Sequence, residues 1–398
     1  MKIVIFTEFF IHDKNSAGRL MSDIVSELGP RFEEIDVYSI YDHGIIEEDN
    51  RWPKNINIYN LGMKLNAKSN SYFIRFFVEL SISFRAIFKI IKLNKLTYYD
   101  GIVWYSPTIF WGPLVLMLSL FKKSKKYLIL RDIFPQWAID LEVINKYSTQ
   151  NLILNFFENL QYKMADIIAI QTEGNKSYFE SSKKLLNKLV ILRNWYDIPK
   201  EVYDLPEELI KKIPLHKKLL VYAGNLGIAQ DQDIILDLIK EMKPLNEFHF
   251  VLIGQKDADR NNIFQAKIRN RLENLTIISS VDQKYVDSIC SISYIGIFSL
   301  DKRHTTHNIP GKFLQYISCG LPVFGICNKG DVVEIIQRHN LGQTYCGNNS
   351  IEAFDALKNL IKNIDEKNIK SEDLKSYVRD NISTKLAAKK IYNDLIKS

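Results

Sequence analysis

Short apolar runs alternate with longer helix-forming segments along the chain, and this alternation constrains the fold more than any other feature. In the first half, helices are predicted over residues 19–28, 72–93 and 151–165. Strands are predicted over residues 2–6, 35–40, 56–61, 101–105, 127–131, 166–171 and 189–192. Such an alternation is typical of parallel sheets whose strands are joined by helices.

The pattern restarts after a polar, proline-containing stretch at residues 197–216. Strands are predicted over residues 218–223, 249–253, 275–278, 294–298 and 322–326, and helices beginning near residues 231, 262, 282, 310 and 332. The sequence therefore predicts an α/β fold of two doubly wound, Rossmann-like domains, at 1–195 and 196–380. A C-terminal helix at 381–398 is expected to pack back on the first domain. We expect the two domains to face each other across a cleft at the carboxyl ends of their strands, where ligands of such sheets bind.

Composition narrows the function classes. The 398 residues are enough for two domains with their own cores, and a net charge of +7 does not demand a polyanion partner. The four cysteines form no CxxC pair and the histidines show no metal-ligand spacing, so no metal site is expected. The N-terminal MKIVIFTEFF predicts a strand rather than a signal peptide, and the apolar run 107–121 is short for a bilayer span. A cytoplasmic location is expected.

A glycine-containing turn follows the predicted strand 218–223. Gly224, Asn225 and Gly227 allow a tight turn with exposed amides, which suits a phosphate but also an ordinary strand-to-helix connection. Asp231 and Asp233 could form a DxD metal–nucleotide motif. Their place at a predicted helix start favours helix capping instead.

The stretch TTHNIPGKF at 305–313 places polar residues before a predicted helix. Pro310 suits a first helical position, Gly311 permits close approach, and Lys312 brings a charge to the positive helix end. Arg303, His304 and His307 lie just upstream. A charged hydrogen bond from Lys312 to a diphosphate would contribute roughly 1.5–3 kcal/mol. The alternative is a helix start with a solvated lysine.

HNIPGKFLQYISCGLPVFG, with YAGNLGIAQD upstream and GDVVEI downstream, resembles the C-terminal domain of family-4 GT-B glycosyltransferases. With LRDIFPQWAID at 130–140 and the basic, aromatic first domain, the chain is similar over nearly its whole length to bacterial transferases of N-acetyl-L-fucosamine and related amino sugars. These enzymes act in O-antigen, lipopolysaccharide and capsule assembly. The resemblance implies a UDP-sugar donor, no cofactor and no metal.

The resemblance also implies donor-binding residues. Gly224, Asn225 and Gly227 would approach the diphosphate, Lys312 would neutralise it, and the loop 307–311 would contact diphosphate and sugar. The remaining donor-binding residues are Gly18, which would let its helix start close to the diphosphate, Arg303 upstream of that loop, His307, Asn308 and Gly311 within it, and Ser279 and Val281 at the uracil. The family carries two glutamates eight positions apart, where this chain has His307 and Gln315. Gln315 can still donate to a ribose hydroxyl, and His307 changes the contact with the donor sugar.

Arg131 and Asp132 end a predicted strand of the first domain. Asp132 could take the proton of the acceptor hydroxyl, a contribution worth roughly two to four decades in rate. The alternative is a structural Arg–Asp pair that steadies the following turn. His12 and Asp13, before Gly18, are weaker candidates and are expected to be solvated.

Residues 71–126 are rich in basic and aromatic side chains. Arg85, Lys89 and Lys92 share one helical face, near the phenylalanines at 73, 76, 77, 84 and 88. This pattern favours a helix lying on an anionic membrane surface. A helix covering the sheet with its lysines in water is the alternative, and nucleic acid fits the clustered aliphatic residues less well.

The sequence thus predicts a metal-independent glycosyltransferase of the hexosyltransferase type, peripheral on the inner face of the cell membrane. It would move an amino-deoxysugar from UDP to a saccharide on undecaprenyl diphosphate. Two alternatives stay open. A GT-B UDP-sugar 2-epimerase would act without an acceptor, and a non-catalytic scaffold of a glycan-assembly complex would bind no UDP.

Overall fold

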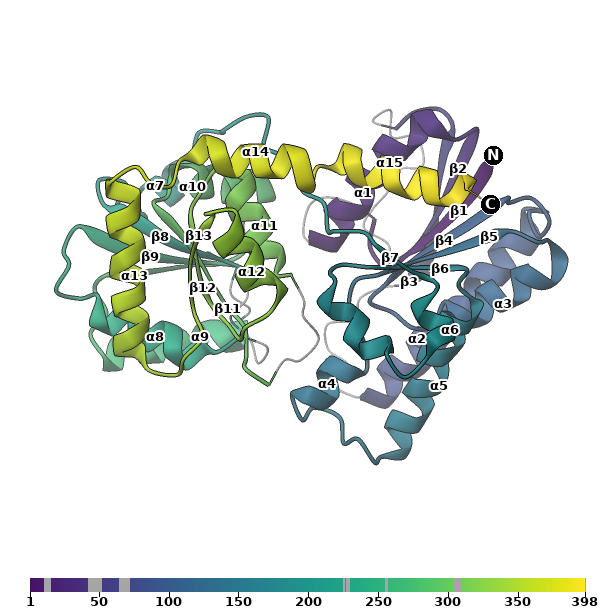
Figure 1. Ribbon diagram of the computed structural model, residues 1–398, viewed down its shortest axis with the longest axis horizontal. Helices are drawn as coiled ribbons and strands as arrows, with labels where there is room; N and C mark the ends of the chain where they lie inside the picture. The colour runs from purple at the N-terminus through teal and green to yellow at the C-terminus, as the bar shows by residue number, and fades with distance from the viewer. Residues whose placement is uncertain are drawn as a thin grey trace. The chain divides into compact units, whose positions relative to one another are not determined.

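The computed structural model describes residues 1–10, 16–41, 52–63, 72–224, 226, 230–254, 257–303 and 309–397. The chain divides into two compact units (Figure 1). The first comprises Met1–Asn194 together with Thr384–Ser398, and the second comprises Trp195–Ser383.

In the described part of the first unit, seven parallel strands form one sheet in the order β3-β2-β1-β4-β5-β6-β7. The strands are β1 (Lys2–Thr7), β2 (Glu34–Tyr41), β3 (Ile56–Met63), β4 (Gly101–Ser106), β5 (Lys125–Leu130), β6 (Ile167–Ile170) and β7 (Leu189–Ile191). The strand order reverses between β1 and β4, so a topological switch point lies there, as in dinucleotide-binding folds.

The helices of the first unit pack on this sheet over a core that includes the fully buried Phe6, Trp104 and Trp111. They are α1 (Ser16–Leu28), η1 (Gly29–Arg31), α2 (Tyr72–Lys92), α3 (Gly112–Phe121), α4 (Gln136–Asp140), α5 (Thr149–Met164), η2 (Gly174–Phe179), α6 (Lys183–Leu186) and α15 (Thr384–Ile396). Helix α3, which we did not predict, occupies most of the apolar run 107–121. Its proline at the second position costs no hydrogen bond in the first turn.

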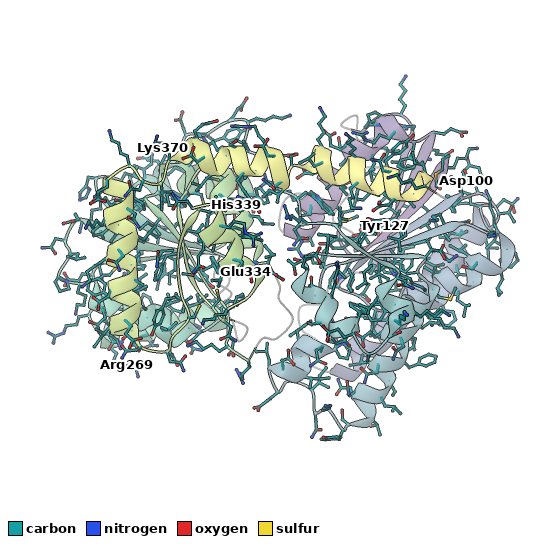
Figure 2. The ribbon with its side chains drawn as sticks, viewed as in Figure 1. Asp100, Tyr127, Arg269, Glu334, His339 and Lys370 are labelled. Carbon is teal, nitrogen blue, oxygen red and sulfur yellow. The ribbon has the colours of Figure 1, made fainter. Side chains whose placement is uncertain are left out.

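Helix α15, at the C-terminal end of the chain, packs on the first unit. The Tyr127 hydroxyl of β5 donates to a carboxylate oxygen of Asp394 at 3.1 Å, and the rings of Phe32 and Tyr392 meet edge to face at 5.3 Å. Figure 2 labels Tyr127 among the side chains near this helix. The last helix is therefore fixed to the first unit by a partly buried hydrogen bond and an aromatic contact.

The described part of the second unit contains six parallel strands in the order β10-β9-β8-β11-β12-β13. They are β8 (Lys218–Ala223), β9 (Phe248–Ile253), β10 (Leu275–Ile278), β11 (Ile295–Ser299), β12 (Val323–Ile326) and β13 (Gly342–Tyr345). The helices are α7 (Glu207–Ile210), α8 (Gln232–Glu241), α9 (Asp257–Arg269), α10 (Gln283–Ile292), α11 (Gly311–Ser318), α12 (Asp331–Arg338), α13 (Ser350–Asp365) and α14 (Ser371–Asn381). Helix α14 packs on α11, and its Tyr377 ring lies 4.7 Å from that of His339, labelled in Figure 2.

The predicted fold of two doubly wound parallel sheets is confirmed, and every predicted strand is present with ends within two residues. Several other elements differ from the prediction. Strand β13 was missed because its sequence, GQTY, is polar and half-buried at the sheet edge. Helices α13 and α14 were not assigned, and α9 begins at Asp257 rather than near residue 262. None of the helices in the described ranges is long and apolar enough to cross a membrane.

Candidate functional site

Three neighbouring strands of the second unit end together at one edge of their sheet. The amide of Gly224, after β8, donates to the carbonyl of Ile253 at 2.8 Å, and the amide of Gly254, after β9, donates to Ile278 at 3.1 Å. Both glycines have positive φ, +104° and +80°, which disfavours any residue with a Cβ. Gly254 was not among the predicted site residues. The exposed Ser279 and half-buried Val281 follow β10 at this same edge.

Lys312 lies against the end of β8. It is the second residue of α11, and its Nζ is 4.7 Å from the centroid of the Tyr222 ring. A Cβ placed on Gly224 would lie 3.0 Å from Lys312 Cε, so a side chain at this position would crowd the lysine. Burial lowers the pKa of Lys312 to about 8. The structure thus brings two predicted donor residues together, with Tyr222 as a further member.

Helix α11 is held at this edge by Tyr316. Its hydroxyl donates to the carbonyl of Ile297 in β11 at 3.0 Å and accepts from the amide of Ala223 in β8 at 2.7 Å. Gly296 lies beneath the ring, where a Cβ would be 2.4 Å from it. The helix begins at Gly311 after Pro310, whose side chain offers no cap. Its positive end and first-turn amides therefore lie beside Lys312, as an anion site requires.

Two other predicted donor residues make side-chain contacts of their own. Gln315 is buried and donates through Nε2 to Asp287 Oδ1 at 2.8 Å, while Arg303 donates to both carboxylate oxygens of Asp301, at 2.9 and 2.8 Å. Sequence reasoning missed both acidic partners, because neither carries a motif. The predicted residues Asn225, Gly227, His307 and Asn308, with the weaker candidates His12 and Asp13, lie outside the described residues.

The capping interpretation of Asp231 is confirmed. Its side chain accepts from the amide of Ile234, and α8 begins at the next residue with Asp233 in its first turn. Within the described residues, no group of three or more His, Cys, Asp or Glu side chains could hold a metal ion.

In the first unit, polar side chains line the carboxyl ends of β4, β5, β6 and β7. Ser106 Oγ donates to the main-chain oxygen of the half-buried Asp132 at 3.4 Å. Gln171 Nε2 donates to the carbonyl of Arg131, and Asn194 Nδ2 donates to Gln171 Oε1 at 3.0 Å. This row places the predicted base Asp132 beside buried amides that the sequence did not single out.

Arg131 points its guanidinium at a tyrosine. Its Nη1 donates to the Tyr105 hydroxyl at 2.8 Å. Burial favours the neutral form of Arg131. Its electrostatic attraction to Tyr105 and Asp132 and its hydrogen bond to Tyr105 outweigh burial, so the pKa of the guanidinium is raised. Gly18, predicted to contact the donor, is buried in the first turn of α1.

The predicted membrane residues lie on the last three turns of α2. Arg85 and Lys92 are exposed, and the half-buried Lys89 has its Nζ 5.9 Å from the Tyr59 ring centroid. Beside them, α2 and β3 border a groove of about 500 Å³ lined by Asn60, Leu61, Ser81, Phe84, Arg85, Phe88 and Lys89. The side chains of residues 73, 76 and 77 are outside the described set.

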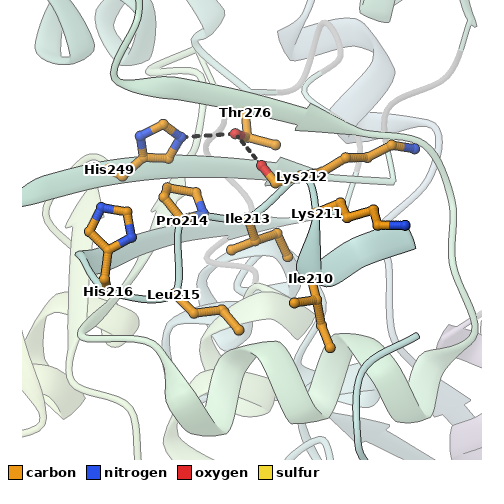
Figure 3. A pocket seen from close by; sticks show the side chains of 9 residues that line it. All are labelled: Ile210, Lys211, Lys212, Ile213, Pro214, Leu215, His216, His249 and Thr276. Atoms are coloured by element: carbon orange, nitrogen blue, oxygen red, sulfur yellow. Dashed lines mark hydrogen bonds between the residues drawn. The ribbon is translucent and has the colours of Figure 1, made fainter. Parts of the chain in front are cut away.

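A second hollow, of about 510 Å³, lies at the opposite, amino-terminal edge of the second sheet (Figure 3). His249 of β9 is bonded to the hydroxyl of Thr276 at 2.9 Å, and that hydroxyl donates to the carbonyl of Lys212 at 3.2 Å. Burial and the nearby Lys217 and Lys267 lower the pKa of His249 to about 4. Its place at the amino ends of the strands sets it apart from the candidate site around Lys312.

Solved structures of low sequence identity share this fold. The sucrose-phosphate synthase of Thermosynechococcus elongatus superposes with a TM-score of 0.75 at 11% identity, over 99% of both chains. HepE of Anabaena, solved in complex with UDP, gives 0.70 at 14% identity over 99% of both chains. WaaG, a glycosyltransferase involved in lipopolysaccharide biosynthesis, gives 0.70 at 12% identity, over 99% of this chain and all of that one. The fold is that of the GT-B glycosyltransferases.

Residues 207–380 match the family model described as glycosyl transferases group 1. This stretch covers most of the second unit, including the edge formed by Gly224, Gly254 and Lys312. No match is found among curated protein sequences. The chain thus carries a group 1 glycosyl transferase domain over most of its second unit, within a GT-B fold.

Proposed function

We propose that this glycosyltransferase transfers an amino-deoxysugar, such as N-acetyl-L-fucosamine, from UDP to a saccharide on undecaprenyl diphosphate during O-antigen or capsule assembly. The observation that carries the proposal is the position of Lys312 between Gly224 and the Tyr222 ring, at the N-terminus of α11. A diphosphate there would gain a cation, helix amides and close backbone approach at a glycine. The UDP held by HepE, which shares the fold, supports this choice of donor.

The amino-sugar assignment rests on the resemblance of residues 307–325 to amino-sugar transferases. His307 stands where the broad family carries a glutamate, so a neutral or cationic ring would meet the donor sugar in place of a carboxylate. With Ser279 and Val281 proposed at the uracil, the base, the diphosphate and the sugar would each meet a different loop of the second unit.

In the proposed reaction, the bond between the anomeric carbon and the UDP oxygen breaks, and negative charge develops on the departing UDP. Lys312 and the start of α11 would stabilise that charge. In the first unit, the Asp132 carboxylate would take the proton of the acceptor hydroxyl, whose oxygen forms the new bond to the anomeric carbon. The row of Ser106, Gln171 and Asn194 supports this role, because it fixes the main chain on both sides of Asp132.

The groove between β3 and α2 supports a lipid-linked acceptor. It joins apolar surface from Leu61, Phe84 and Phe88 to the cations of Arg85 and Lys89. An isoprenoid diphosphate presents the complementary chemistry, a chain for the apolar surface and phosphates for the cations. We place the enzyme on the inner face of the cell membrane, where such an acceptor would be held.

The proposal is tested first by calorimetry with UDP, GDP and ADP, and then by a panel of UDP-sugars with a short-chain lipid-linked acceptor. We expect UDP to bind most tightly and UDP-amino-deoxysugars to give product. No binding of any nucleotide would favour a scaffold, and conversion of a UDP-sugar without acceptor would favour an epimerase. Turnover with UDP-glucose alone would contradict the amino-sugar assignment and leave the UDP site intact.

A further inference from the structure

Helix α2 carries an apolar row on its solvent side. Phe84, Phe88 and Ile91 are 66%, 72% and 48% exposed and stand four and three residues apart, so they lie on one side of the helix. The opposite side is also apolar and faces the core through Ile82, Ala86 and Ile90. A surface helix that covers a sheet ordinarily has polar residues on its outer side.

The next two helices repeat this arrangement. On α3, Leu116 and Leu120 are 40% and 77% exposed, and on α5, Leu152 and Phe156 are 73% and 63% exposed. Each pair is four residues apart, which places both members on the outer side of their helix. Three helices of one unit therefore each present large apolar side chains to solvent.

The three rows lie on neighbouring helices. Helix α3 packs against both α2 and α5, and the three are grouped together in Figure 1. The approach of α3 to α5 is close, since a Cβ on Gly112 would lie 3.2 Å from Cγ of Leu160. We call the outward sides of α2, α3 and α5 the apolar face. Exposed apolar surface that extends across several elements marks an interaction site.

The charged side chains near the apolar face indicate which kind of partner binds to it. Helix α3 has no charged residue. Among the described side chains of α2 and α5, the exposed charges are Arg85, Lys92 and Lys163, all positive, whereas Glu158 is buried and Glu79 half-buried. A second copy of the chain would place these cations against like charges, which is unfavourable. An apolar centre with cations around it matches the acyl boundary and phosphates of an anionic bilayer.

We propose that the apolar face docks on an anionic lipid bilayer. Ile91, Leu120 and Phe156 enter the boundary between headgroups and acyl chains, and Lys92 and Lys163, outside the acceptor groove, meet the lipid phosphates. The predicted contact was α2 alone, and the structure adds α3 and α5 to it. This inference rests on the proposed function, because docking on a membrane would bring the enzyme to its proposed lipid-linked acceptor.

The test is flotation of the full chain with vesicles of phosphatidylcholine alone or with phosphatidylglycerol. The variant is Leu120→Ser with Phe156→Ser, both on exposed side chains outside the groove beside β3. The matched control is Phe264→Ser with Ile268→Ser on α9 of the second unit, which are 49% and 57% exposed. We expect the wild type and the control to float with anionic vesicles, and the variant to partition at least tenfold less.

Undiminished flotation of the Leu120/Phe156 variant would overturn the inference, as would equal binding of the wild type to both kinds of vesicle. A wild type that ignores vesicles but self-associates in sedimentation, with the variant monomeric, would assign the face to a second copy instead. UDP calorimetry on the same proteins separates the two proposals. If the protein binds no UDP but still floats with anionic vesicles, the proposed function is contradicted and the docking of the apolar face on lipid is supported.

Discussion

The ammonium of Lys312 lies 4.7 Å from the centroid of the Tyr222 ring, and its side chain passes beside Gly224, the residue that follows β8. The lysine and the tyrosine are 90 residues apart in the sequence. The contact brings a cation to the carboxyl edge of the sheet, where α11 begins.

Replacing Lys312 with alanine is expected to lower turnover by one to three decades while the fold stays intact. In the proposed reaction, the variant lacks a cation where charge would develop on the departing UDP, an interaction expected to be strongest in the transition state. Lys284→Ala is the matched control, because Lys284 is also the second residue of its helix and lies 4.9 Å from a tyrosine ring centroid. Equal activity in both variants would remove Lys312 from the site.

UDP affinity should fall as the pH rises above 8. Burial lowers the pKa of Lys312 to about 8, so the empty site is charged below that pH and loses its charge above it. A bound diphosphate favours the charged form, and binding therefore takes up protons above pH 8. We expect affinity to fall by up to about tenfold per pH unit there. Calorimetry at pH 7.5 and 9.5 measures the fall. Lys312→Arg should show little of it, because arginine stays charged.

Gly224→Ala should weaken UDP binding at least tenfold. Its φ of +104° makes a Cβ cost about 1–2 kcal/mol, and that Cβ would also meet Lys312 Cε at 3.0 Å. Gly62→Ala separates the two effects, since Gly62 has φ +69° but no atom within 4 Å of the added Cβ. We expect both variants to lose similar stability in chemical denaturation and only the Gly224 variant to lose UDP affinity.

Asp132→Asn should lose at least about two decades in turnover, the contribution of a general base, with UDP affinity unchanged. The Ser106 hydroxyl bonds to the main-chain oxygen of Asp132, so this contact survives the substitution. Asp140→Asn, on α4 of the same unit, controls for the change in net charge. A lower melting temperature with preserved turnover would instead assign Asp132 to the structure of the turn.

Glu158→Gln should reduce the pH dependence of stability. Burial raises the pKa of Glu158 to about 7. The hydroxyls of Tyr178 and Tyr162 donate to its Oε1 at 2.8 and 3.0 Å, and these hydrogen bonds oppose part of that rise. The folded state thus favours the neutral acid. The stabilising contribution of neutral Glu158 is complete below pH 4.5, its pKa in the unfolded chain, and is lost as the pH rises through 7, its pKa in the folded chain.

The loss amounts to about 3 kcal/mol in the free energy of unfolding, because the pKa rises from 4.5 in the unfolded chain to about 7 in the folded one. Urea denaturation of the wild type at pH 4.5, 6 and 8 should show this decline, and Glu158→Gln should reduce it. Glu180→Gln, an exposed carboxylate in the same unit, should leave it unchanged.

The sequence by itself determined the alternation of strands and helices, and hence both parallel sheets, because side-chain periodicity is a local property of each segment. It also determined the capping of α8 by Asp231, since a cap acts within three residues. It missed β13, where a polar edge strand carries no apolar run.

Only the tertiary structure decided which side chains meet. The contact of Lys312 with Tyr222, the hydrogen bond from Gln315 to Asp287 and the room left by Gly224 join residues from different elements. The outward direction of Phe84, Leu120 and Phe156 was likewise undetermined, because a helix that is apolar on both sides has no periodicity to show which side is buried. Neighbouring elements make that choice, and their positions depend on contacts between residues far apart in the chain.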